Sequence, residues 1–180
     1  MSLPSRTVRF WLDQDPDYYF NPPAHFDNLL RDKFRAQVEK SFTGMYFAEW
    51  SEEAESCLAL ILMLDQFPRN IYRGSARMYF GDVQASTLAH LAAARNYLEE
   101  VPAEARRWFV MPLMHSENLA DQDLCVDLCE RFDLADTLPH AKEHREIVAK
   151  FGRFPHRNEL LYRASTPEEK EYLASGGFEG

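Results

Sequence analysis

The chain has 180 residues, enough for one domain with a substantial buried core, and 46% of its residues are hydrophobic. The formal net charge is −9, which argues against a nucleic-acid binder, because phosphate neutralisation needs a basic face. Aromatic residues make up 13% of the chain, a share that is too high for a disordered sequence. We therefore expect a single folded domain that spans residues 1–180.

Helical periodicity dominates the first third of the chain. Apolar residues recur every four positions from Phe26 to Val38, which predicts an amphipathic helix that ends at Gly44. A second helix is predicted from an N-cap at Ser51 to Phe67, and it contains the longest apolar run, "CLALILML". Because this run is apolar on every side, we expect its helix to be the central and most buried element.

Five further helices are predicted downstream, and each has a start signal in the sequence. Their capping or first residues are Asp82, Pro102, Ser116, Pro139 and Thr166. Pro112 is expected to end the second of these helices, and Gly152 the fourth. No segment shows the alternating pattern of a strand, so we predict an all-α, compact domain of about seven to eight helices.

Two stretches around Phe-Pro pairs echo each other: "FPRN" begins at Phe67 and "FPHRN" at Phe154. A residue before proline is disfavoured in the α region, so both phenylalanines are expected to end helices and turn into the core. The polar residues around these two corners are expected to meet and to bind a small anion or a peptide carboxylate, because guanidinium groups match both. These residues are Arg69, Arg73, Arg153, His156, Arg157 and Asn158.

Acidic residues are expected to balance part of this charge. Asp65 ends the apolar run, so we predict that it is buried and bonded to an arginine. Its expected partner is either Arg69, one turn further on, or Arg153 across the fold, and all three side chains are expected within reach of one another. Asp121 is predicted as a second ion-pair partner, four residues after Glu117 on the same helix face.

The wall that faces the two corners is predicted to carry His115 and Glu117. Together with His156 they are the candidate catalytic residues, because a positioned imidazole or carboxyl group can exchange protons near working pH. A catalytic triad of Ser116, His115 and Asp121 is a poorer interpretation. A serine that adjoins its histidine and caps a helix is badly placed for that geometry.

Three motifs in order, "LDQFPRNIYRG", "MPLMHSENLADQ" and "FGRFPHRN" followed by "STPEE", resemble the bacterial family catalogued as domain of unknown function 924. The resemblance covers nearly the whole chain and implies an all-helical, tetratricopeptide-like fold. It implies no activity. His144 matches the family pattern, whereas His140 departs from it, and the chain shows no clear tetratricopeptide repeat consensus.

Neither a metal nor another cofactor is expected. The stretch "HAKEH", from His140 to His144, fits the H-x-x-E-H pattern of inverted zincins, but three matching letters favour a core or pocket histidine. Cys125 and Cys129 lie four residues apart among apolar neighbours, so we interpret them as small core residues. The sequence has no glycine-rich phosphate loop and no dinucleotide fingerprint.

The chain is expected to be cytoplasmic. Its three cysteines are an odd number, and its first residues, "MSLPSRTVRFWLDQ", lack the apolar segment of a secretory signal. The longest apolar run is too short to span a bilayer, so no membrane association is predicted. The oligomeric state is left open.

Three hypotheses for function follow. The leading one is a helical domain that binds a small anionic ligand or an acidic peptide end, because the corners supply more arginines than the three acids Asp65, Glu117 and Asp121 need. A second is a metal-independent hydrolase or transferase that acts on such an anion, with His115 or His156 as the acid or base. A third is a structural or protein-interaction scaffold without a pocket, whose charges form a closed network.

Overall fold

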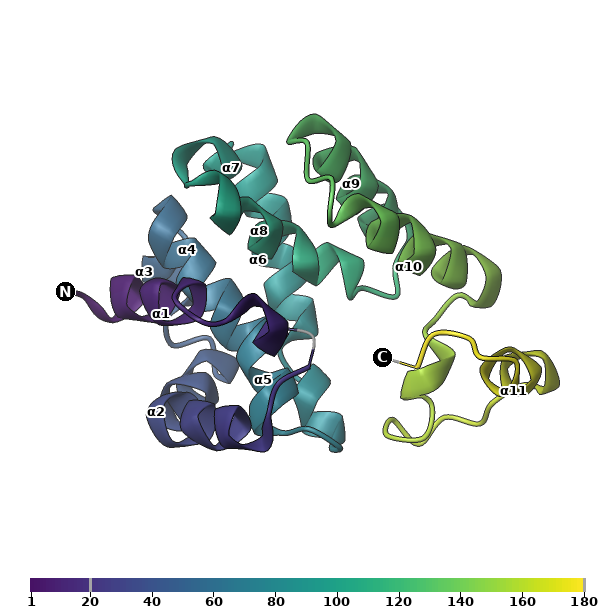
Figure 1. Ribbon diagram of the computed structural model, residues 1–180. Coiled ribbons are helices and arrows are strands. Elements are labelled where there is room, and N and C mark those ends of the chain that lie inside the picture. Colours follow the sequence, from purple (N-terminus) through teal and green to yellow (C-terminus); the bar gives the residue numbers. More distant parts are fainter. Residues whose placement is uncertain (20, 180) are drawn as a thin grey trace.

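The computed structural model describes residues 1–19 and 21–179, and all of its regular elements are helical (Figure 1). The α-helical segments are α1 (Leu3–Leu12), α2 (Ala24–Phe42), α3 (Phe47–Trp50), α4 (Ala54–Ile61), α5 (Phe67–Ile71), α6 (Asp82–Ala94), α7 (Tyr97–Glu100), α8 (Ala103–Met114), α9 (Leu119–Arg131), α10 (Leu138–Phe151) and α11 (Pro167–Ala174). The remaining elements are the 3-10 turns η1 (Pro16–Tyr19), η3 (Ala76–Tyr79) and η4 (Pro155–Arg157) and the π-helical turn η2 (Leu62–Gln66).

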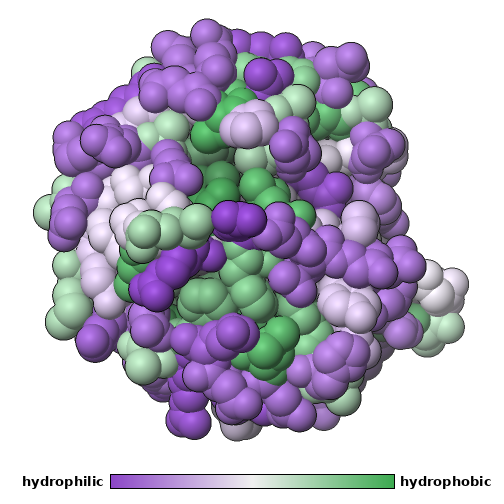
Figure 2. All heavy atoms as spheres, turned by 60° about the vertical axis from the view of Figure 1, so that its left-hand side comes forward, coloured by the Kyte–Doolittle hydropathy of each residue, from purple (hydrophilic) through white to green (hydrophobic). Residues whose placement is uncertain are grey.

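Within the described residues there is no β-strand, which confirms the all-α prediction. There are more helical segments than the seven to eight expected, because short pieces such as α3 and α7 are single turns. In this part of the chain no helix is both long and apolar enough to cross a membrane. Figure 2 shows one face of the molecule, where hydrophilic side chains surround a hollow in which hydrophobic ones gather.

A continuous helical rod made of α4, η2 and α5 forms the centre of the molecule. Every residue from 57 to 68 is buried, which confirms the prediction that this helix is the most buried element. Helices α1, α2, α6 and α8 pack around it. Because the rod is apolar on every side, each of these helices covers a different part of its surface.

The rod does not end at Phe67, so the prediction of a helix stop at the first Phe-Pro pair is wrong. Phe67 has helical dihedrals (φ −61°, ψ −40°), and its N–H bonds to the carbonyl of Leu62, five residues back, as in a π-helix. A proline cannot donate to the carbonyl four residues before it, and its ring crowds that carbonyl. The wider π turn ahead of Pro68 is the kind of local adjustment that lets a helix continue past such a position.

Three other helix boundaries also differ from the prediction. Pro112 lies inside α8, which continues to Met114. The N-cap of α9 is Asn118, whose side chain accepts from a backbone N–H, rather than Ser116. Asp82 is the first residue of α6, and its carboxylate accepts from Arg69 instead of capping the helix.

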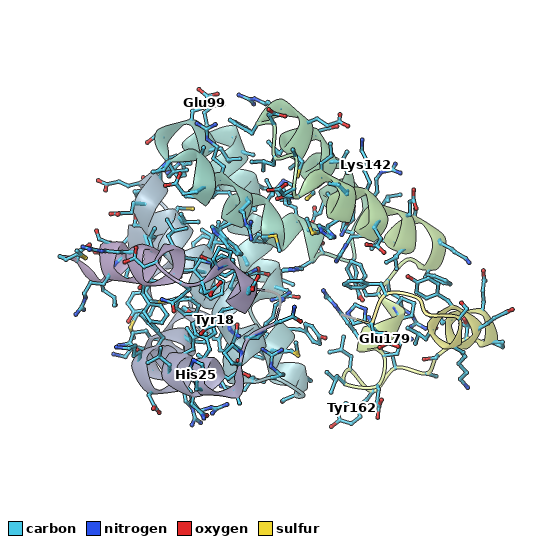
Figure 3. All side chains as sticks on the ribbon, viewed as in Figure 1. Tyr18, His25, Glu99, Lys142, Tyr162 and Glu179 are labelled. Atoms are coloured by element: carbon cyan, nitrogen blue, oxygen red, sulfur yellow. The ribbon has the colours of Figure 1, made fainter. Side chains whose placement is uncertain are left out.

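The C-terminal segment folds back toward the rod after α10. Phe154 is extended (φ −90°, ψ 109°) and fully buried, which confirms the second Phe-Pro corner. It belongs to a small hydrophobic cluster with Ile147 and Val148, separate from the main core. In Figure 1 this segment, from η4 to α11, stands opposite α5. Figure 3 shows Tyr162 at the lower edge of this segment, where the side chain is exposed.

Candidate functional site

A cavity of about 640 Å³ lies among α5, α8, α10 and η4. Its volume is within the range of small-molecule sites. Four of the six histidines of the chain line it: His115, His140, His144 and His156. A cavity of this kind is what the two ligand-based hypotheses from the sequence require.

One wall of the cavity is built around Asp65, which is fully buried in the π turn. Its Oδ1 lies 3.0 Å from Nη1 of Arg69, one turn further along the rod, and 2.7 Å from Nδ1 of His115. The side-chain amide of Gln66 donates to its other oxygen. The prediction of a buried Asp65 bonded to an arginine is thus confirmed, and its arginine is Arg69.

The charges around Asp65 determine its protonation. Burial alone would raise its pKa, but Arg69 and then His115 hold the pKa of this carboxyl well below its ordinary value. Burial, followed by the charge of Arg69, lowers the pKa of His115. At neutral pH the pair is therefore an ionised carboxylate beside a neutral imidazole.

Asp82 joins the two segments that echo each other in the sequence. Its carboxylate accepts from both Nη atoms of Arg69, at 3.0 and 3.2 Å, and from Nη1 of Arg157 at 3.3 Å. Sequence reasoning missed this role, because an aspartate at a helix start is most simply a cap. The one sequence signal for the role of Asp82 as an ion-pair partner was the glycine before it. Gly81 can serve as the N-cap of α6, and the Asp82 carboxylate is then available to the arginines.

Arg157, which lines the cavity, is incompletely paired. It is 6% exposed, and its guanidinium lies 4.6 Å from the ring centres of both Tyr79 and Phe154. It shares its one carboxylate, Asp82, with Arg69, and among the described residues its buried Nε has no hydrogen-bond partner. Burial, followed by the charge of Arg69, lowers the pKa of this guanidinium.

Two further histidines stand beside Arg157 in neutral form. Burial lowers the pKa of His144 to about 4 and that of His156 to about 3. Nδ1 of His144 donates to the carbonyl of His140 at 2.8 Å, which leaves its Nε2 as an acceptor. Both rings contact Phe178 edge-on, and Phe178 lines this side of the cavity.

A second part of the cavity lining carries large apolar side chains beside Arg107, whose guanidinium lies 4.6 Å from the Trp108 ring centre. Helix α8 contributes Trp108, Met111 and Met114, and η3 contributes Met78. Methionine side chains adapt to irregular ligand shapes, and the Trp108 ring offers a flat apolar surface. The cavity therefore has a polar side rich in arginine and histidine and an apolar side.

Arg153 does not join the cluster, so its predicted place beside Asp65 and Arg69 is wrong. It forms two bonds with Glu169, at 2.6 and 2.8 Å, because the capping box of α11 presents that carboxylate nearby. Asn158 is also buried away from the cavity and donates to Glu169.

Glu117 faces the C-terminal segment rather than the cavity. Its carboxylate accepts from Arg163 at 2.6 and 2.9 Å and from the backbone N–H of Phe154 at 2.8 Å. It therefore fixes the second corner in place and is a poor candidate for acid-base chemistry. Asp121 lies 2.8 Å from His90 and contacts no arginine of the corners, which corrects its predicted pairing.

The apparent excess of arginines in the sequence is mostly balanced in the fold. Arg73 lines the cavity but pairs with Asp27 at 2.9 Å, an acid that the sequence argument did not count. Asp82 and Glu169 were likewise left out of that count. What remains of the excess is Arg157, which shares its carboxylate and whose Nε has no hydrogen-bond partner in residues 1–19 and 21–179.

No group of three or more His, Cys, Asp or Glu side chains is arranged to hold a metal ion in residues 1–19 and 21–179. Cys125 and Cys129 are fully buried in the main core, as interpreted from the sequence. His140 and His144 are linked through a helix carbonyl.

Comparison with known proteins gives a family and no activity. Residues 7–177 match the model of a family described as "Bacterial protein of unknown function (DUF924)". The fold is similar to a solved structure described as a protein of unknown function, ATU0120 from Agrobacterium tumefaciens, with 42% identity and a TM-score of 0.88. The similarity covers 97% of this chain and 98% of that one. None of the curated proteins compared with the chain matches it.

Proposed function

We propose that this chain, which belongs to the bacterial DUF924 family, binds a small amphiphilic anion in the cavity beside α5, α8, α10 and η4. The observation that carries the proposal is Arg157, a buried guanidinium on the cavity wall that shares one carboxylate and whose Nε has no partner in the described part of the chain. The acidic group of the ligand is a carboxylate or a phosphate, since both fit the fork of an arginine.

The cost of burying Arg157 supports an anionic partner. A charge removed from water needs close partners of opposite sign, and Asp82 already serves Arg69 through two bonds. A bound carboxylate or phosphate would supply the missing acceptor. The neighbouring histidines are neutral, so they can donate to or accept from the ligand without repelling Arg157 further.

The apolar wall supports a ligand with a hydrophobic body. Trp108, Met111 and Met114 lie on the side of α8 that faces the cavity, where an aryl or alkyl group would displace water from apolar surface. An inorganic anion alone would leave this wall unused. A peptide carboxylate meets the same guanidinium and is included in the test below.

We also propose that the helices form a tetratricopeptide-like array and that the protein works in the cytoplasm. Support for the array comes from α8, α9 and α10, which pack as successive neighbours. Support for the compartment comes from the three cysteines, all of which are free thiols.

A thermal-shift screen with arylalkyl carboxylates, aryl phosphates and short peptides tests the binding proposal. Ligands that bind the native state raise its Tm, so we expect an amphiphilic acid to stabilise the wild type. Arg157→Met should abolish this shift, because Met fills the space between the two rings and cannot bind an anion. The matched control is Arg153→Met on the same segment, whose guanidinium pairs with Glu169 outside the cavity and which should keep the shift. An equal shift in both variants would contradict the proposal.

A further inference from the structure

We propose that His115, oriented by Asp65, is the general base for hydrolysis of a carboxylic ester bound in this cavity. The substrate carries an anionic group at one end and an apolar group at the other. This inference rests on the proposed anion binding, and it adds a reaction to it. It starts from the geometry of the His115 side chain.

The two nitrogens of His115 have different surroundings. Nδ1 lies 2.7 Å from Oδ1 of Asp65, and because that carboxylate is ionised, Nδ1 carries the proton and donates it. Nε2 therefore holds the lone pair. The side chain is 14% exposed and lines the cavity, and in the part of the chain that the structure describes no group hydrogen-bonds Nε2. The basic nitrogen is thus available to a molecule in the cavity.

Asp65 is itself held in place by groups other than His115. Arg69 and the amide of Gln66 both bind its carboxylate, so Asp65 has partners without the histidine. A carboxylate fixed in this way sets the tautomer and orientation of the ring and stabilises the imidazolium when it forms. This is the arrangement of a base and its orienting group.

The second Asp–His pair of the chain provides a contrast. His90 lies 2.8 Å from Asp121, but its side chain is 48% exposed and it does not line the cavity. It pairs through Nε2, with no arginine or glutamine on the carboxylate among the described contacts. The same two residue types therefore occur outside the cavity, which makes His90 a matched control.

The base and the anion-binding group belong to one connected wall. Arg157 bonds to Asp82, Asp82 to Arg69, Arg69 to Asp65, and Asp65 to His115. An acid whose charged end meets Arg157 would therefore have its other atoms within the same cavity as Nε2. We infer that the scissile acyl group lies between the anionic end and the apolar wall of α8.

The reaction balances with water as the only co-reactant. Nε2 of His115 removes a proton from water as its oxygen bonds to the acyl carbon, and the C=O electron pair moves onto the carbonyl oxygen. Collapse of this tetrahedral adduct re-forms the carbonyl and breaks the bond to the leaving oxygen. That oxygen takes the proton from the imidazolium, so the products are a carboxylic acid and an alcohol, and His115 is neutral again.

The pH dependence follows from the groups around His115. Asp65 and Arg69 from the rod, Asp82 from α6 and His156 from η4 all act on the ring. Burial and Arg69 outweigh Asp65, so the pKa of His115 lies below its ordinary value of 6.5. We expect kcat/KM to be constant around neutral pH and to fall only below the pH at which an ordinary imidazole protonates.

The test compares wild type, His115→Gln and the control His90→Gln with two probes. One is the mono-para-nitrophenyl ester of glutaric acid, whose hydrolysis is followed by the release of nitrophenolate. The other is the corresponding anilide, which resists hydrolysis and reports binding by calorimetry. We expect His115→Gln to lower kcat/KM by about 100-fold or more, the usual contribution of a general base, with anilide affinity unchanged. His90→Gln should retain the wild-type rate and pH profile.

The outcomes separate the two proposals. Binding of the anilide without hydrolysis of the ester, or equal rates in wild type and His115→Gln, would overturn the role of His115 and leave anion binding intact. If the anilide does not bind and the ester is not hydrolysed, both proposals fail. A pH profile that falls at the same pH in wild type and His115→Gln would also contradict His115 as the base.

Discussion

The Asp65 carboxylate contacts Arg69 and Gln66 of the rod and His115 at the end of α8. It accepts hydrogen bonds from all three only in its ionised form. Replacing it with alanine leaves the Arg69 guanidinium partly buried with one carboxylate fewer. Removal of one partner of a buried pair costs about 3 kcal/mol or more in the free energy of unfolding. Urea denaturation of Asp65→Ala measures this loss. Asp123→Ala, which removes a half-exposed surface pair with Arg145, should cost less than about 1 kcal/mol, and a similar value for Asp65→Ala would contradict its structural role.

His144 makes stability depend on pH in acid. Burial lowers its pKa to about 4 in the folded protein from about 6.5 in the unfolded chain, which therefore binds the proton more readily. The contribution to stability is complete above about pH 6.5 and is lost as the pH falls toward about 4. The full loss from this residue is about 3 kcal/mol, by the energy equivalent of a pKa shift.

Denaturation of His144→Gln across this pH range measures the effect. The variant should show a shallower fall in stability, with the remaining slope due in part to His156, whose pKa is lowered in the same direction. His25→Gln is the control, since this exposed histidine at the start of α2 (Figure 3) does not line the cavity. An unchanged slope in His144→Gln would show that His144 is not a buried neutral histidine.

At the scale of elements, the π turn depends on a close contact with the start of α6. A Cβ atom on Gly81 would lie 2.3 Å from the carbonyl oxygen of Leu64, the carbonyl that faces Pro68 four residues later. Gly81→Ala must therefore push the rod and α6 apart. We expect a loss of about 2 kcal/mol or more, which chemical denaturation would show.

Gly74 is a control that distinguishes the loss of this contact from the effect of ordinary backbone strain. Gly74 has φ +76° with open space around it, so Gly74→Ala should cost only the strain of the left-handed conformation, about 1 kcal/mol. Equal effects at the two positions would mean that the contact between Gly81 and Leu64 is not rigid. A neutral Gly81→Ala would contradict the packing of the π turn against α6.

Helix positions could be predicted wherever local chemistry alone decides them. The capping box at Thr166 and the left-handed stop at Gly152 (φ 67°) are where the sequence places them. The prediction failed at Pro68 and Pro112, because burial of the rod and of α8 favours a continuous helix over the local preference to stop. Asp82 was assigned to a cap for a similar reason, since its two arginine partners come from distant segments.

At the scale of the whole molecule, the cavity is formed by segments that are far apart in the chain. The sequence nominated Arg69, Arg157 and His115, which do lie along one connected wall. It also nominated Arg153 and Glu117, which stabilise the C-terminal segment instead. Residue types indicated which side chains need partners, but the choice of partner depends on how helices pack, and that is not encoded in any short stretch.

The arrangement of both walls predicts the orientation of a ligand. The charged end should meet the guanidinium of Arg157, and the apolar body should lie along α8. Reversal would place the apolar body against Arg157 and Asp82, where it would cover charged groups without giving them a hydrogen-bond partner. The orientation is therefore a direct consequence of the proposed function.

A crystal structure of the protein with para-iodophenylbutyrate, with the iodine located by anomalous scattering, tests the proposed binding and its orientation most directly. We expect an iodine peak in the cavity, within about 4 Å of Trp108 or Met111, and a carboxylate at hydrogen-bond distance from Arg157. An iodine peak beside Arg157, or a ligand bound at full occupancy only outside the cavity, would contradict the proposed binding.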